Sequence, residues 1–111
     1  INFRHNNFSS LDDTQYDIVL FLAVIHWIYY SIKKYNTFHK ILTKLCKITK
    51  RILIIEWVSE KDDAIQSTDK SKNKSYSTLN FISELKKMNF KKIIKKKSNN
   101  KHRTLFICYK G

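Results

Sequence analysis

Two stretches of the chain are apolar at consecutive positions rather than at alternate ones. Residues 16–24 have the sequence YDIVLFLAV, and residues 51–58 have the sequence RILIIEWV. A short continuous apolar run between polar residues is typical of a strand that is buried on both faces of a parallel sheet. We therefore predict a buried strand over each of these ranges.

Between these two strands the apolar residues follow a helical spacing. They recur three or four positions apart, with lysines on the other face, at Phe38, Ile41, Leu42, Leu45, Cys46 and Ile48. Thr37 precedes this pattern and can cap the helix through its side-chain oxygen. A strand, a helix and a strand in this order form a βαβ unit, which predicts two neighbouring parallel strands.

The remaining residues predict a loop, a second helix and two short strands. Residues 59–75 are polar and without a period, which favours a long loop. The helix that follows has Ser77 or Thr78 as its cap. Its predicted buried face consists of Leu79, Ile82, Leu85 and Met88. Residues 91–97 and 103–110 then predict two antiparallel strands joined by the polar sequence SNNK.

The resulting order, β-α-β-α-β-β, predicts an α/β fold. It corresponds to the C-terminal half of a doubly wound sheet in which the last two strands are antiparallel. Folds of this kind host many activities, so function has to be inferred from particular residues.

Glycine and proline are almost absent from the 111 residues. The only glycine is Gly111 and there is no proline, whereas average usage is about 7% and 5%. Glycine is normally needed where a loop approaches a phosphate or a cofactor closely. Since the chain also begins with Ile1, we expect residues 1–111 to be a partial domain whose glycine-bearing portion lies upstream.

The net charge of +13 comes from 22 Lys and Arg residues against 9 Asp and Glu. Such a surplus is typical of proteins that bind nucleic acids or anionic membranes. A coding bias toward lysine produces the same surplus. Lysine greatly outnumbers arginine here, although arginine is the better bidentate phosphate ligand, which favours the coding bias. We interpret the lysines of residues 86–97 as the solvated side of a helix and a strand.

Cys46 and Cys108 form neither a disulfide framework nor a metal-binding spacing. They are interpreted as the free thiols of a reduced, cytoplasmic protein. The longest apolar run, residues 18–30, is shorter than the about 20 residues that span a membrane. Asp62 and Asp63 stand alone without further ligands, so no metal site is expected.

Three segments resemble the later motifs of class I S-adenosylmethionine-dependent methyltransferases. YDIVLFLAVIHWIYYS resembles the fourth-strand motif, and LTKLCKITKRILIIEWVSEKDDAIQ resembles the next helix, strand and loop, closest to a bacterial branch that includes nodulation-type methyltransferases. STLNFISEL, MNFKKIIKKK and HRTLFICYK are similar to the last helix and reversed hairpin. The resemblance covers residues 8–110 and implies a Rossmann-like methyltransferase domain with S-adenosylmethionine as cofactor.

Two parts of the family pattern are missing from this sequence. The glycine-rich turn that meets the methionine portion of the cofactor is absent, and so is the acidic residue that binds the ribose. What remains amounts to about half of a cofactor site.

The candidate catalytic residues are His26 and Glu56. His26 follows a strand that ends at the ligand crevice of an open α/β sheet, and its pKa range suits proton transfer from a hydroxyl. Glu56 ends the next strand and can position an acceptor or a water. Each can also be structural, His26 as a hydrogen-bonded residue and Glu56 as an ion-paired one.

The resemblance implies cofactor contacts at five positions. Ala23 and Val24 would line the methionine portion, Trp27 would be a further cofactor contact, and Asn7 and Phe8 would contact the adenine. The implied reaction is methyl transfer to an O or N nucleophile of a small-molecule or glycan-like acceptor. Two alternatives stay open, a basic nucleic-acid-binding module and a catalytically inactive methyltransferase-like domain.

Overall fold

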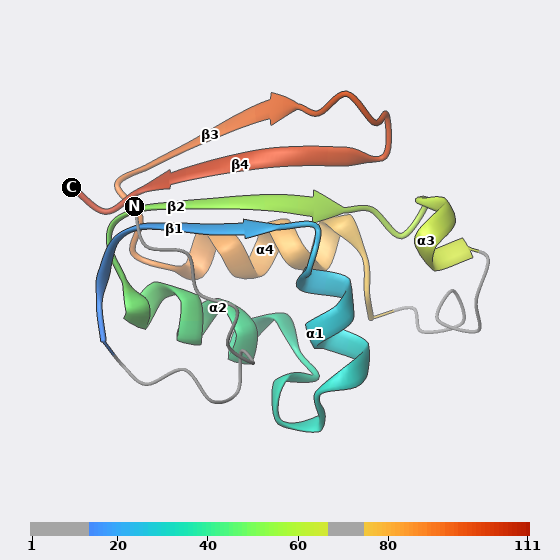
Figure 1. Cartoon of the computed structure of the whole chain (residues 1–111), viewed down its shortest axis with the longest axis horizontal. Helices are drawn as coiled ribbons and strands as arrows, with labels where there is room; N and C mark the ends of the chain where they lie inside the picture. Colours follow the sequence, from blue (N-terminus) through green and yellow to red (C-terminus); the bar gives the residue numbers. More distant parts are fainter. Residues whose placement is uncertain (1–13, 67–74) are drawn as a thin grey trace.

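The structure, a computed structural model, describes residues 14–66 and 75–111, so Asn7 and Phe8 lie outside the described residues. Within these described residues, four strands form one mixed sheet in the order β1-β2-β4-β3 (Figure 1). Their bounds are β1 (Tyr16–Leu22), β2 (Thr49–Val58), β3 (Lys92–Lys97) and β4 (Arg103–Tyr109).

The strand pairing agrees with the βαβ and hairpin patterns. β1 and β2 are parallel, with Val19 opposite Leu53 and Leu22 opposite Glu56. β4 is antiparallel to both of its neighbours, β2 and β3. The predicted α/β class, the parallel pair and the antiparallel final hairpin are therefore confirmed.

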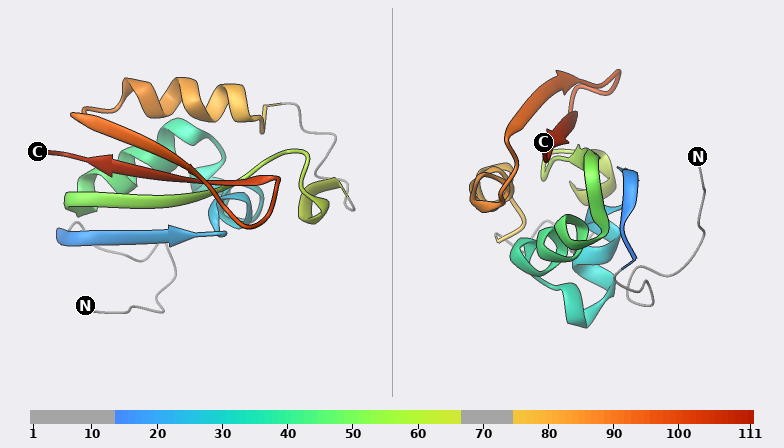
Figure 2. Two further views of the ribbon diagram at one scale, coloured as in Figure 1. Left: turned by 90° about the horizontal axis from the view of Figure 1, so that it is seen from above. Right: turned by 90° about the vertical axis from the view of Figure 1, so that its left-hand side faces the viewer.

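The longer helices gather on one side of the sheet (Figures 1 and 2). In chain order the helices are α1 (Ile25–Ser31), the 3-10 helix η2 (Lys33–Tyr35), α2 (Phe38–Ile48), α3 (Asp63–Gln66) and α4 (Thr78–Lys87). Thr37 caps α2 by accepting from the Lys40 N–H at 3.3 Å, and Ser77 caps α4 by accepting from the Asn80 N–H at 3.2 Å. Both caps were expected from the sequence.

A stack of aromatic rings packs α4 and α2 against the sheet. Trp57 on β2 is 1% exposed. Its ring stacks on Phe81 of α4 with centroids 4.4 Å apart, and on Tyr76 at 4.9 Å. Phe38 of α2 meets the same ring edge-on at 5.5 Å. Such pairs add about 0.5–1.5 kcal/mol each to the burial of the rings.

The expectation that both strands are buried on both faces was wrong. In β2, Ile52 and Ile54 are partly exposed, and β1 departs further from the expectation. Ile18, Leu20 and Leu22 are each about half exposed, whereas Phe21 is buried. β1 lies at one end of the strand order, and the longer helices cover only one face of the sheet. The strand also ends at Leu22, because Ala23 takes a positive φ of 54°.

The predicted buried face of the second helix was wrong at one position. Leu79 is 82% exposed, whereas Phe81 and Leu85 are buried and Ile82 and Met88 pack partly against the core. Phe81 defines the inward face because its ring stacks on Trp57.

The polar stretch of residues 59–75 is not loop throughout. It contains the short helix α3, which begins where the Asp62 carbonyl accepts from the N–H groups of Ile65 and Gln66. Residues 67–74 of this stretch lie outside the described residues.

Cys46 is half-buried and Cys108 fully buried, and both are free thiols. Burial, together with the nearby Cys46, raises the pKa of the Cys108 thiol to about 12. Within the described ranges, no helix combines the length and apolar character that crossing a membrane requires.

Candidate functional site

The carboxyl ends of β1 and β2 meet at the same edge of the sheet, because the strands are parallel and Leu22 lies opposite Glu56. We call this region the carboxyl edge. It consists of residues 23–27 after β1, residues 56–62 at the end of β2, and Arg103 at the start of β4. Ligands of open α/β sheets bind outside this end of the strands.

The chain turns from β1 into α1 within two residues. Ala23 has a φ of 54°, a left-handed conformation that non-glycine residues rarely adopt. Val24 then acts as the N-cap residue, and its carbonyl accepts from the Ile28 N–H at 3.1 Å. Ala23 is half-buried and Val24 is 37% exposed. The turn thus presents a small apolar surface at the carboxyl edge.

His26 and Trp27 are neighbours with opposite environments. His26 is 6% exposed, whereas Trp27 is 59% exposed and its ring centroid lies 6.4 Å from that of His26. An exposed tryptophan beside the apolar turn offers a flat surface on which a planar ligand can stack. The buried His26 immediately precedes Trp27 in the chain.

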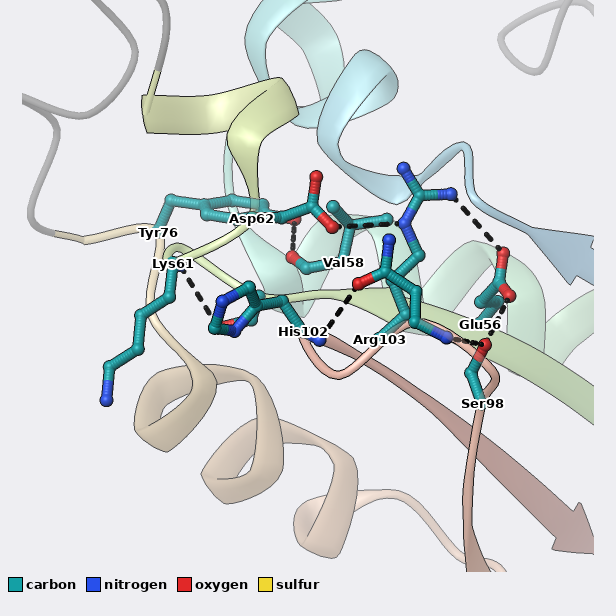
Figure 3. Close-up of polar contacts among 10 residues, drawn as sticks. Glu56, Val58, Lys61, Asp62, Tyr76, Ser98, His102 and Arg103 are labelled. Atoms are coloured by element: carbon teal, nitrogen blue, oxygen red, sulfur yellow. Dashed lines mark hydrogen bonds and ion pairs between the residues drawn. The ribbon is translucent and has the colours of Figure 1, made fainter.

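Glu56 points to the sheet face opposite the helices, because its neighbours Ile55 and Trp57 are both buried in the core. Its carboxylate is held by two residues from the final hairpin (Figure 3). Arg103 Nη1 lies 4.0 Å from Glu56 Oε1, and Ser98 Oγ donates to Oε2 at 3.5 Å. Glu56 is thus at the predicted edge, with an arginine partner that the sequence did not indicate.

Arg103 also binds Asp62, which is 4% exposed. Its Nε donates to Asp62 Oδ2 at 3.1 Å, so one guanidinium bridges two carboxylates (Figure 3). Sequence reasoning missed this arrangement because the residues are far apart in the chain. The adjacent Asp62 and Asp63 were the only signal, because a buried carboxylate needs a cation or several donors, and the sequence does not show which of the two is buried.

Glu60 links the end of β2 to the start of α4. Both carboxylate oxygens accept from the Thr78 N–H at 3.2 Å, and Oε1 accepts from the Thr78 hydroxyl at 2.6 Å. Trp57 Nε1 donates to the same hydroxyl at 3.0 Å. Burial raises the pKa of Glu60, but these hydrogen bonds and one from Ser59 outweigh it, so the pKa is lowered overall. Glu60 is therefore a structural carboxylate of the carboxyl edge.

Tyrosines form a second polar group beside this edge. Tyr76 donates to the Val58 carbonyl at 2.6 Å, and the Tyr29 and Ser75 hydroxyls share a hydrogen bond. Burial, with the nearby Tyr29 and Glu60, raises the pKa of Tyr30 to about 12. The Tyr30 hydroxyl is therefore protonated at neutral pH and unsuited to act as a base.

Two surface hollows lie away from the predicted catalytic residues. One, of about 480 Å³, lies along the end of α1 and is lined by Tyr29, Tyr30, Ser31, Ile32, Lys33, Asn36 and Ser75. The other, of about 400 Å³, lies at the opposite end of the strands and includes Cys46 and Lys110. Neither includes His26, Trp27 or Glu56. Within residues 14–66 and 75–111, no group of three His, Cys, Asp or Glu side chains is arranged to hold a metal ion.

Comparisons with protein-family models, with curated proteins and with solved structures give no match to this chain. Its function is therefore inferred from its own residues and geometry.

Proposed function

We propose that this chain forms the C-terminal part of a class I methyltransferase domain. The domain would transfer the methyl group of S-adenosylmethionine to an O or N nucleophile of a small-molecule or glycan-like acceptor. The observation that carries the proposal is the carboxyl edge, where Leu22 lies opposite Glu56 and the apolar turn after β1 leads directly into His26 and Trp27. The reversed hairpin that follows is the arrangement that the sequence resemblance implies.

The residues present fit one side of the cofactor. Ala23 and Val24 offer an apolar turn at the carboxyl edge, and the exposed Trp27 ring offers a stacking surface. The chain contains no glycine-rich turn and no carboxylate at the ribose position. We propose that a segment outside this sequence supplies both. The half-exposed apolar face of β1 supports this, because apolar residues of this kind are normally covered.

When bound, the cofactor supplies an activated methyl group on a sulfonium. The chain's own residues would contribute alignment and proton handling. Holding the acceptor nucleophile in line with the methyl carbon is the main contribution to the rate. His26 would take the proton of a hydroxyl acceptor, and its burial keeps the imidazole away from bulk water. Glu56, held by Arg103, would orient a polar group of the acceptor.

Calorimetry tests this proposal in two steps. The 111-residue chain should bind S-adenosylmethionine weakly or not at all, because the glycine turn is missing. The complete gene product that contains these residues should bind it and transfer a labelled methyl group to an acceptor. Micromolar binding by the 111-residue chain would contradict the proposal that it holds only about half of the cofactor site. A complete gene product that binds no S-adenosylmethionine would overturn the proposed function, and binding without transfer would identify an inactive domain.

A further inference from the structure

The positive charge of the chain is concentrated in its last quarter. Residues 85–111 contain ten Lys or Arg and no Asp or Glu, whereas residues 1–84 contain twelve Lys or Arg and nine Asp or Glu. The net charges of the two parts are therefore +10 and +3. A coding bias toward lysine acts on the whole chain and does not explain this difference. A strong charge asymmetry of this kind indicates a polyanionic partner.

Six of these basic residues surround the edge strand β3. We call them the lysine rim: Lys91, Lys92, Lys95, Lys96, Lys97 and Lys101. Every one of them is exposed. Among the described residues, the ion pairs of this segment involve Lys87 and Arg103, and none involves a lysine of the rim. The charge of the rim is therefore not neutralised within the described part of the chain.

The position of β3 displays this charge on both sides of one strand. β3 is the last strand of the order β1-β2-β4-β3, so among the described residues it pairs with β4 alone (Figure 2). Lys92 and Lys96 lie on one face of the strand, and Lys95 and Lys97 lie on the other. With about 3.4 Å per residue, the strand from Lys92 to Lys97 presents charge over roughly 17 Å. An extended polyanion can lie along such an edge.

We propose that the lysine rim is a binding surface for single-stranded nucleic acid. The lysines would neutralise consecutive phosphates without reading the sequence, as compact point charges do. Tyr109 is opposite Lys92 in the register and is partly exposed, so it offers a ring on which one unpaired base can stack. This binding does not depend on the proposed methyl transfer.

Two alternative roles of the lysine rim fit the structure less well. Lysines on an edge strand also prevent edge-to-edge aggregation, but that role does not require an acid-free segment that includes Lys101 in the turn. An anionic membrane surface would attract the same charge. Membrane binding also uses exposed apolar residues, however, and Ile93 and Ile94 between the lysines are partly buried.

Fluorescence anisotropy of the 111-residue chain tests the proposal with a labelled mixed-sequence DNA strand of about 20 nucleotides. The rim variant carries Lys92→Gln, Lys95→Gln, Lys96→Gln and Lys97→Gln. The matched control carries Lys33→Gln, Lys34→Gln, Lys40→Gln and Lys50→Gln, which are also exposed lysines. Both variants lose four positive charges. A difference between their affinities therefore reports the position of the lysines and not the total charge. Circular dichroism and gel filtration verify that each remains folded and unaggregated.

We expect the rim variant to bind at least about tenfold more weakly than the parent, and its dependence of log affinity on log salt to become shallower by about 3. The control should bind within about twofold of the parent. Equal losses in both variants would overturn the proposal, as would undetectable binding by the parent. Tighter binding to the matching duplex, or to vesicles of phosphatidylserine, would also overturn it in favour of a duplex or a membrane partner.

Discussion

The Nε atom of Arg103 donates to the Oδ2 atom of Asp62 at 3.1 Å, although the two residues are 41 positions apart. This bond connects the start of β4 to the segment that follows β2. Because the Asp62 carbonyl also accepts the first hydrogen bonds of α3, the ion pair holds the loop of the carboxyl edge against the sheet. The same guanidinium approaches Glu56, so the bridge orders both carboxylates.

Arg103→Met should therefore destabilise the protein. The substitution removes the charged partner of a carboxylate that is 4% exposed. We expect urea denaturation to show a loss of about 1.5–3 kcal/mol in the free energy of unfolding. Lys101→Met, in the adjacent turn and exposed, is the matched control and should stay within about 0.5 kcal/mol of the parent. Equal effects of the two substitutions would show that the bridge contributes no stability.

The aromatic stack predicts different effects for two nearby positions of α4. Phe81→Ala should lower the free energy of unfolding by about 3–5 kcal/mol, because it removes a ring that is fully buried against Trp57. Leu79→Ala, two residues away, should change it by less than about 0.5 kcal/mol. Thermal or urea unfolding of both variants measures the difference. A large loss on truncating Leu79 would mean that α4 presents its other face to the sheet.

Leu79 and Phe81 show which part of α4 could be predicted from the sequence. The spacing of apolar residues predicts that residues 78–87 form an amphipathic helix, and this was confirmed. It does not choose between faces centred on Leu79 and on Phe81, since both have apolar residues at helical intervals. The choice is made by the ring of Trp57, which is distant in sequence and close in space.

The position of the carboxyl edge could be predicted from the sequence, but the ion pair formed there could not. Continuous apolar runs indicate parallel strands, and parallel strands place Glu56 near the residues after Leu22. The partner of Glu56 could not be inferred, because Arg103 reaches it only through the antiparallel insertion of β4 between β2 and β3. The exposed face of β1 was also unpredictable, since an apolar run does not say which faces the helices cover.

Glu60 predicts a dependence of stability on acid pH. Its pKa in the folded protein is lowered from the ordinary value of 4.5. A lowered folded pKa gives stability that is fully present above the unfolded pKa and is lost as the pH falls through the folded pKa. Glu60→Gln should therefore be less stable than the parent at pH 7, and the difference should shrink below pH 4.5. Denaturant midpoints across this range measure it.

Glu84 provides a control for that experiment, because its carboxylate pairs with the exposed amine of Lys87 at 3.1 Å. The Glu84→Gln variant removes a 25% exposed carboxylate whose ion-pair partners, Lys87 and His39, are themselves exposed. Ion pairs with exposed partners contribute little, so its stability relative to the parent should change little with pH. A Glu60→Gln variant as stable as the parent at pH 7 would contradict the role of Glu60 at the start of α4.

His26 gives the prediction that separates a catalytic role from a structural one. In the complete gene product, His26→Ala should lower turnover on the order of a hundredfold or more, because a general base acts on the acceptor during the chemical step. The affinity for S-adenosylmethionine should change little. Trp27→Ala is the matched comparison: its exposed ring is proposed to contact the cofactor, so this substitution should weaken cofactor binding more than turnover at saturation.

The pH profile of turnover distinguishes the two roles further. If His26 accepts a proton, the acidic limb of the parent's profile should disappear in His26→Ala, whereas a packing defect leaves its shape unchanged. Circular dichroism must first show that the variant folds, because His26 is 6% exposed and its loss leaves a space in the core. Turnover within about twofold of the parent in a folded variant would make His26 a structural residue. The position of the carboxyl edge depends on the pairing of β1 with β2 and would be unaffected by that result.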